Sequence, residues 1–196
     1  NSIDVIITDP PYGSNVQYLE LSQFWHMWNV DLYDSSNIDH KLEAVVHRKL
    51  TNKESKTHAI YEQNLLRVFK ECHRVLKEEG KMIMTFNNKS LNSWLALLFS
   101  IFRAGFHLNL EKIVFQDGVA QYKETAHTRA KGSPFGDFIY EFSKDNQYKS
   151  NSSYTKEDLI KFINAKLDYS TIQQTKGENR DMILIDFFKS IVPKLE

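Results

Sequence analysis

Four consecutive residues near the start of the chain bring together a carboxylate, two rigid prolines and an aromatic ring: Asp9, Pro10, Pro11 and Tyr12. They follow a β-branched, apolar run at residues 3–8, which predicts a short buried strand. Proline fixes its φ angle near about −65° and lacks an N–H group, so the turn is stiff, and we expect its carbonyl oxygens to stay free of local donors. The sequence thus presents two hydrogen-bond acceptors, a carboxylate and a peptide oxygen, beside a flat ring.

Such an arrangement suits a planar ring that carries an NH₂ group. The exocyclic amine of adenine or cytosine is a poor nucleophile, because its lone pair is delocalised into the ring. If the Asp9 carboxylate and the Pro10 carbonyl each accept one N–H, the nitrogen moves toward tetrahedral geometry and its lone pair becomes available. Tyr12 would stack on a base taken out of the duplex. The plainer alternative is a strand-ending turn with Asp9 as a local cap.

The elements that hold this turn are predicted from hydrophobic periodicity. Apolar residues at helical spacing predict three helices, over residues 18–28, 58–79 and 90–103. Short β-rich runs predict further strands over residues 81–86, 106–115 and 134–143. Gly80 is expected to end the second helix and Ser90 to cap the third. Because no helical pattern separates the last two strands, we expect them to pair antiparallel in an α/β sheet, with ligands beyond the carboxyl ends of its strands.

The remaining segments are polar and weakly periodic. Residues 31–56 predict a long loop, a kind of segment that is usually functional or disordered. We divide the chain into a catalytic region, residues 1–146, and a linker with short C-terminal helices, residues 147–196. The predicted C-terminal helices span residues 156–167 and 181–191.

The composition excludes several classes of protein. The 196 residues carry a net charge of zero, so any nucleic-acid binding must use local patches. The single cysteine, Cys72, rules out a disulfide framework and a cysteine-based zinc site within this chain, and its helical position favours a core residue over a nucleophile. The histidines show no metal-ligand spacing, so we expect no metal. No apolar run reaches the roughly 18 residues that span a membrane, and we expect a cytoplasmic protein.

The residues around the turn resemble a known family. "DPPY" after "VIIT" resembles the catalytic motif of the S-adenosyl-L-methionine (AdoMet)-dependent amino-methyltransferases that act on DNA bases. The longer "TDPPYGSNVQYLELSQFWHMW" looks most like the large adenine-specific DNA methylases, and "VFKECHRVLKEEGKMIMTFNN" and "AKGSPFGDFIYEF" are similar to later segments of that family. The resemblance covers residues 3–144 and implies a Rossmann-like methyltransferase sheet, AdoMet as cofactor and an adenine flipped out of DNA as substrate.

The resemblance also implies roles for the turn. Asp9 and Pro10 would orient the target amine, Pro11 would stiffen the corner, and Tyr12 would stack on the base. Asp in the first motif position favours adenine N6 over cytosine N4. A tRNA guanine N2-methyltransferase stays open as an alternative, because those enzymes also resemble an Asp-Pro-Pro-Tyr-Gly pattern, although the aromatic segment that follows argues against it.

One motif of the family is missing. The family binds AdoMet largely through a glycine-rich Phe-x-Gly-x-Gly turn, and the chain contains none. We therefore expect the C-terminal half of the methyltransferase sheet, with the missing N-terminal part of a larger chain as partner. The remaining cofactor contacts are expected from Asp9, Phe86 and Asn87, although Asn87-Asn88 also fits a plain turn. The other interpretation is an inert fragment or nucleic-acid-binding module of a larger methylase.

Two basic clusters are candidates for contacts with DNA phosphates. They comprise Arg48 and Lys49 in the polar loop, and Lys123, Arg129 and Lys131 before the last strand. A solvated surface explains both clusters equally well. Trp25 and Trp28 are expected to pack in the core, with the lining of a base pocket as the alternative.

Overall fold

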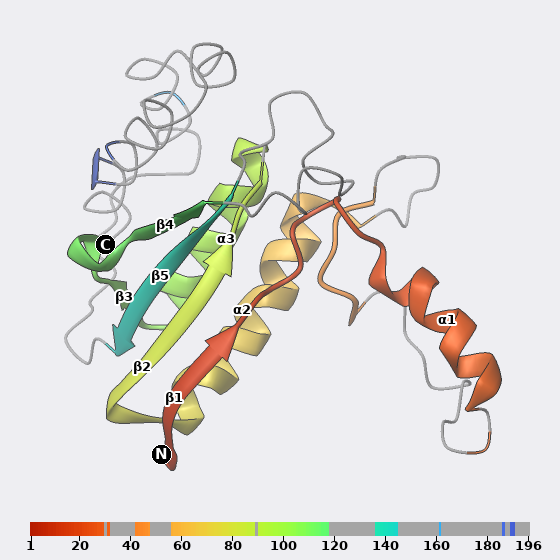
Figure 1. Ribbon diagram of the computed structural model, residues 1–196, viewed down its shortest axis with the longest axis horizontal. Helices are drawn as coiled ribbons and strands as arrows, with labels where there is room; N and C mark the ends of the chain where they lie inside the picture. The colour runs from red at the N-terminus through yellow and green to blue at the C-terminus, as the bar shows by residue number, and fades with distance from the viewer. Residues whose placement is uncertain are drawn as a thin grey trace.

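Five strands and three α-helices are seen in the computed structural model, which describes residues 1–29, 31, 42–47, 56–88, 90–117 and 136–144, and the single residues 161, 186, 189 and 190 (Figure 1). The strands are β1 (Ile3–Thr8), β2 (Leu76–Phe86), β3 (Phe106–Leu108), β4 (Val114–Asp117) and β5 (Gly136–Lys144). The helices are α1 (Tyr18–Trp28), α2 (His58–Val75) and α3 (Leu91–Arg103), with a 3₁₀ turn at Leu110–Lys112.

The strands form one mixed sheet in the order β1-β2-β5-β3, and β4 also pairs with β5. Strands β1 and β2 are parallel, whereas β5 runs antiparallel to β2, β3 and β4. The α/β class and the antiparallel pairing of the late strands are thus confirmed. The predicted single strand over residues 106–115 is wrong, because the 3₁₀ turn divides it into β3 and β4, both of which pair with β5.

The core lies between one face of the sheet and helices α2 and α3, which cover the same side (Figure 1). Alternate residues of β2 and β5 point into it, as the period of two in a strand requires; these include Met82, Met84, Phe138, Tyr140 and Phe142. Helix α3 is buried almost all round, since the sheet and α2 both pack on it. Its apolar sequence is therefore that of a core helix.

The other face of the sheet carries no helix among the described residues, and this overturns the prediction that β1 is buried. The side chains of Ile3, Val5 and Ile7 are 40%, 52% and 80% exposed. They lie on the face opposite Ile6, which packs against the core. Strand β1 is thus the outer strand of the described sheet, and one of its faces is bare.

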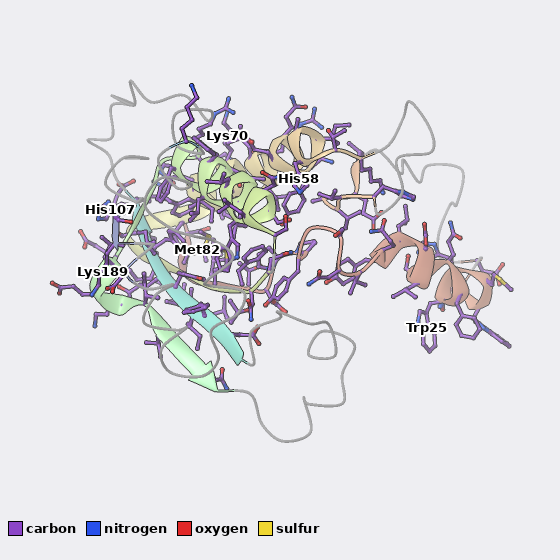
Figure 2. The ribbon with its side chains drawn as sticks, turned by 90° about the horizontal axis from the view of Figure 1, so that it is seen from above. Trp25, His58, Lys70, Met82, His107 and Lys189 are labelled. Atoms are coloured by element: carbon purple, nitrogen blue, oxygen red, sulfur yellow. The ribbon has the colours of Figure 1, made fainter. Side chains whose placement is uncertain are left out.

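Helix α1 has the predicted limits, but the prediction that Trp25 and Trp28 pack in the core is wrong. The helix extends away from the sheet (Figure 1), and Figure 2 shows Trp25 far from Met82 in the core. None of its residues is buried, and Trp25 and Trp28 are 65% and 74% exposed. Phe24 lies between them, with ring centroids 5.3 Å from Trp25 and 6.3 Å from Trp28. The helical spacing of these residues predicts a packed face. In the structure, Phe24, Trp25 and Trp28 instead form an exposed aromatic stripe on α1.

The N-terminal end of α1 is tied to the rest of the protein by two hydrogen bonds. The backbone N–H of Leu19 donates to Glu43 Oε1 at 2.8 Å, and Gln17 Nε2 donates to the carbonyl of Val46 at 3.1 Å. Glu43 therefore satisfies one of the N–H groups that a helix start leaves without an intrahelical partner.

Helix α2 begins after Thr57, whose side chain accepts a hydrogen bond from the N–H of Ile60 at 3.3 Å. It ends at Val75, so the prediction that it reaches residue 79 and stops at Gly80 is wrong. Leu76 already pairs with Ile3 in the sheet, and Lys81 pairs with Val5, with an irregularity in the register between them. Pairing with β1 has overridden the helical pattern of the intervening residues, and Gly80 is buried within β2.

Several predictions fall on residues outside the described part of the chain. These are most of the 31–56 loop, the C-terminal helices and the boundary after residue 146, which stays a prediction. Within the described residues, no helix has the length and apolar character needed to cross a membrane.

We predict that Gly80→Ala destabilises the protein. A Cβ at this position would lie 2.7 Å from Leu76 Cγ and 2.9 Å from the carbonyl oxygen of Lys77. Overpacking of this kind costs about 1–3 kcal/mol of unfolding free energy, measurable by urea denaturation. The neighbouring Glu79→Ala, at an exposed position, is the control and should change the stability by less than about 0.5 kcal/mol. Equal stabilities of the two variants would contradict the buried position of Gly80 in β2.

Candidate active site

The Asp9 carboxylate lies at the carboxyl end of β1, on the face of the sheet that carries no described helix. The parallel register pairs Ile7 with Ile83 and Thr8 with Met84, so the next step along it brings Asp9 beside Thr85. Thr85 Oγ1 donates a hydrogen bond to Asp9 Oδ1 at 2.9 Å. Asp9 is exposed, so its carboxylate is open to a ligand and is not used in the packed interior.

The two prolines differ in what their carbonyl oxygens do. The Pro11 carbonyl accepts from the Tyr61 hydroxyl at 2.6 Å and from the N–H of Gly13 at 3.0 Å. The expectation that both carbonyls stay free of donors is therefore wrong for Pro11. No described residue donates to the carbonyl of Pro10, the residue for which a role in binding the amine was expected. Burial raises the pKa of Tyr61, so its hydroxyl keeps the proton that it donates.

Tyr12 stands beside Asp9 with its ring half-buried. The ring centroid lies 4.9 Å from that of Phe86, with an angle of 56° between the planes. Burial and then a hydrogen bond with the Asp9 carboxylate raise the pKa of Tyr12, and the charge of Asp137 acts in the same direction. The Tyr12 hydroxyl therefore stays protonated over the neutral range and is a second donor to Asp9.

Gly13 allows the turn to close against α3. Its φ angle of 57° lies in the left-handed region that favours glycine, and a Cβ here would lie 2.5 Å from Ser93 Oγ and 3.2 Å from Asn88 Nδ2. Its carbonyl accepts from the N–H of Val46 at 3.0 Å. The turn is thus held between α3 and the described piece of the polar loop, residues 42–47.

Asn88 connects the turn to the start of α3, a role that the sequence did not reveal. Its Nδ2 donates to the Tyr12 carbonyl at 2.9 Å, and its Oδ1 accepts from the N–H of Ser90 at 2.8 Å. Its own carbonyl accepts from Trp94 Nε1 at 2.7 Å. Ser90 is the residue before the helix, as predicted, but its side chain makes no capping hydrogen bond. The Asn-Asn pair after β2 is therefore a structural junction and not a plain turn.

Two further residues lie near Asp9 and Tyr12 and were not predicted from the sequence. Tyr18, at the first position of α1, is 45% exposed, and burial and then the charge of Asp9 raise its pKa. Asp137 near the start of β5 acts on Tyr12 in the same way. No sequence signal marks Asp137, which lies within the run predicted as a strand over residues 134–143. The antiparallel register places it at the amino end of β5, beside the carboxyl end of β2, where ligands of α/β sheets gather.

The expected cofactor contacts have limited access. Phe86 is 0% exposed and packs between Tyr12 and Trp94, whose ring centroid is 4.6 Å away, so neither its side chain nor its backbone is open to a ligand in this arrangement. Asn87 is 8% exposed. Phe86 instead supports the ring of Tyr12 from beneath, and a role of either residue in cofactor binding stays a prediction.

Five basic residues were expected to contact DNA phosphates. Arg48, Lys49, Lys123, Arg129 and Lys131 all lie outside the described residues. Lys56, in the described end of the same loop, forms an ion pair with Glu43, and both side chains are mostly buried. This lysine holds the loop to the base of α1 through Glu43, so it is not available to a phosphate in this arrangement.

Two other kinds of site find no support. Burial raises the pKa of the Cys72 thiol, which is the opposite of what a nucleophilic thiolate needs, and Cys72 packs against the core as predicted. Within the described ranges, no group of three or more histidine, cysteine, aspartate or glutamate side chains is arranged to hold a metal ion.

The fold and the turn define a class of protein: an α/β enzyme with an oriented carboxylate, a peptide oxygen that accepts from no described residue, and an aromatic ring at the carboxyl end of a strand, groups that suit a planar amine. A family model described as DNA methylase matches residues 3–191, and the chain belongs to this family of DNA methyltransferases. A search of curated proteins found no match. Methyl transfer to amino groups of DNA bases is accordingly the general activity of the family, and DNA is its substrate.

We predict that Gly13→Ala destabilises the protein for two separable reasons. The left-handed φ angle costs alanine about 1–2 kcal/mol, and contact of the new Cβ with Ser93 Oγ adds to this. Adding Ser93→Ala removes the 2.5 Å contact with Oγ but neither the contact with Ser93 Cβ at 3.1 Å nor the backbone strain, so the double variant should regain only part of the loss, relative to Ser93→Ala alone. Unfolding free energies from chemical denaturation test this, and a Gly13→Ala variant as stable as the parent would refute the geometry of the turn.

Proposed function

We propose that the chain carries the catalytic part of an AdoMet-dependent methyltransferase that acts on the N6 amine of adenine in DNA. The observation that carries the proposal is the corner at the end of β1. There an exposed Asp9 carboxylate is hydrogen-bonded on one side by Thr85, and the neighbouring Pro10 carbonyl has no donor among the described residues.

Asp9 and Pro10 then act on the amine by orientation. One N–H of the amine donates to the carboxylate and the other to the Pro10 carbonyl, which draws the nitrogen out of conjugation with the ring. The ring of Tyr12, supported by Phe86, stacks on the extruded base, since a base inside the duplex cannot reach this corner. Adenine is preferred over cytosine because the motif begins with Asp, as the resemblance to adenine-specific methylases implies.

The described residues do not by themselves make an AdoMet site. Methylases of this family generally use AdoMet, but this chain lacks the glycine-rich turn, and Phe86 and Asn87 are nearly or fully buried. We propose that further polypeptide, the N-terminal part of a larger chain, supplies the main cofactor contacts. The outer edge of β1, which pairs with no other described strand, and the exposed Ile3, Val5 and Ile7 beside it support docking there.

The first test replaces the acid. In the intact methylase, Asp9→Ala should lower methyl transfer to DNA by about 10²–10³-fold or more, as loss of an electrostatic contact in the transition state does elsewhere. The matched control is Asp4→Asn on the same strand, whose exposed carboxylate pairs with Lys77 at 2.6 Å and should be dispensable. Mass spectrometry of hydrolysed DNA should show N6-methyladenine. N4-methylcytosine as the product would overturn the adenine assignment, and transfer to tRNA alone would overturn the DNA assignment.

The second test concerns the cofactor. Calorimetry should detect no binding of AdoMet by this 196-residue chain alone, and binding should appear when the additional polypeptide is present. Tight binding by the chain alone would show that its own residues complete the site and would contradict the proposed division. The same titration with Asp9→Ala separates loss of cofactor binding from loss of methyl transfer.

A further inference from the structure

Thr85 is the residue outside the Asp-Pro-Pro-Tyr turn that makes a direct hydrogen bond to the Asp9 side chain in the described structure. It lies in β2, where it pairs with Ile139 of β5, and the residue before it, Met84, is the last that pairs with β1, so its backbone is held within the sheet. Threonine is β-branched and stiff at χ1, and the hydroxyl of Thr85 is therefore presented from a rigid element. Asp9, by contrast, lies just beyond the end of its strand and is exposed.

We propose that Thr85 is a positioning residue: by donating to Asp9 Oδ1 at 2.9 Å, it holds the carboxylate in one orientation and leaves Oδ2 to accept from the target amine. This inference rests on the proposed function. Asp9 remains the catalytic residue, and Thr85 acts through it. The Thr85 side chain also hydrogen-bonds with Tyr12, the second donor to the same carboxylate.

The physical reason is the freedom of an exposed aspartate. Its χ1 angle has three staggered wells, and water competes for both oxygens, so an unsupported carboxylate points at the amine for only part of the time. A displacement of about 1 Å can cost on the order of 10²-fold in rate, and a hydrogen bond to a rigid donor avoids this. The Tyr12 hydroxyl is a second donor to the same carboxylate, so loss of Thr85 alone should weaken the orientation without abolishing it.

The hydroxyl can be removed with little effect on the fold. Valine has the same shape as threonine and an equal or higher preference for strands, so Thr85→Val deletes the donor and retains the packing. Thr85→Ser keeps the donor and removes the methyl group. Thr8→Val makes the same chemical change on β1, on the opposite face of the sheet, at a hydroxyl with no hydrogen-bond partner among the described residues.

The kinetic test uses the intact methylase with tritiated AdoMet and unmethylated DNA amplified by the polymerase chain reaction. Thr85→Val should lower kcat by about 10-fold and change KM for DNA by less than about twofold, because it removes an orientation that matters in the transition state. Thr85→Ser should restore kcat to within about threefold of the parent, and Thr8→Val should match the parent within about twofold. An unchanged kcat in Thr85→Val overturns the proposal, as does an equal loss in Thr85→Ser.

A second measurement does not depend on methyl transfer. Three-bond NMR couplings in the isotopically labelled 196-residue chain report the χ1 distribution of Asp9. In the parent and in Thr85→Ser, we expect the Asp9 side chain to occupy one χ1 rotamer. In Thr85→Val, we expect couplings that are averaged over several rotamers. If Asp9 keeps a single rotamer in Thr85→Val, the positioning role of Thr85 is refuted, whatever the methyl-transfer assay shows. If the parent fails to methylate DNA but Asp9 loses its orientation as expected, the proposed function fails and the role of Thr85 in orienting Asp9 stands.

Discussion

The candidate site depends above all on the parallel pairing of β1 with β2. This register places Asp9 beside Thr85 and sends both side chains to the face of the sheet opposite α2 and α3, where the described part of the chain has no helix. A shift by one residue would turn Asp9 toward the helices, because neighbouring strand residues point to opposite faces. The apolar packing of Ile6 against the core opposes such a shift, since it fixes which residues of β1 face inward. Core packing and the chemistry of the turn are thus linked through one strand.

The turn after β1 is held by groups from three directions. Tyr61 of α2 donates to the Pro11 carbonyl, Asn88 donates to the Tyr12 carbonyl, and the N–H of Val46 donates to the Gly13 carbonyl. Three successive peptide oxygens are therefore satisfied by the protein, whereas the Pro10 oxygen before them has no donor among the described residues. Pro10 is itself buried, and buried peptide groups that lack a partner are costly. An acceptor without a donor beside an exposed carboxylate is the pattern expected where a ligand donor completes the hydrogen bonding.

Apolar surface in the described structure is concentrated in two places, the bare face of β1 and the stripe on α1. The first lies beside the unpaired edge of the sheet, and the second extends from the corner that holds Asp9, since the charge of Asp9 acts on Tyr18 at its beginning. Isolated exposed apolar residues are ordinary, but contiguous ones usually mark an interface. The proposed partner of the surface at β1 is the N-terminal part of a larger chain. Helix α1 is fixed to the rest of the protein by polar contacts at its N-terminal end.

The sequence by itself determined what depends on neighbours along the chain. The limits of β1 and α1, the buried character of α3 and the Asp-Pro-Pro-Tyr corner follow from periodicity and from the fixed φ angle of proline, which are local properties. The tertiary structure alone decided that β1 has a bare face, that Trp25 and Trp28 are exposed, and that Leu76 leaves the helix to pair with Ile3. It alone brought Thr85 to Asp9, 76 residues away along the chain, and Asn88 to Tyr12. The reason is that local pattern states which residues can be buried or can donate a hydrogen bond, whereas pairing across a sheet determines which neighbour each of them meets.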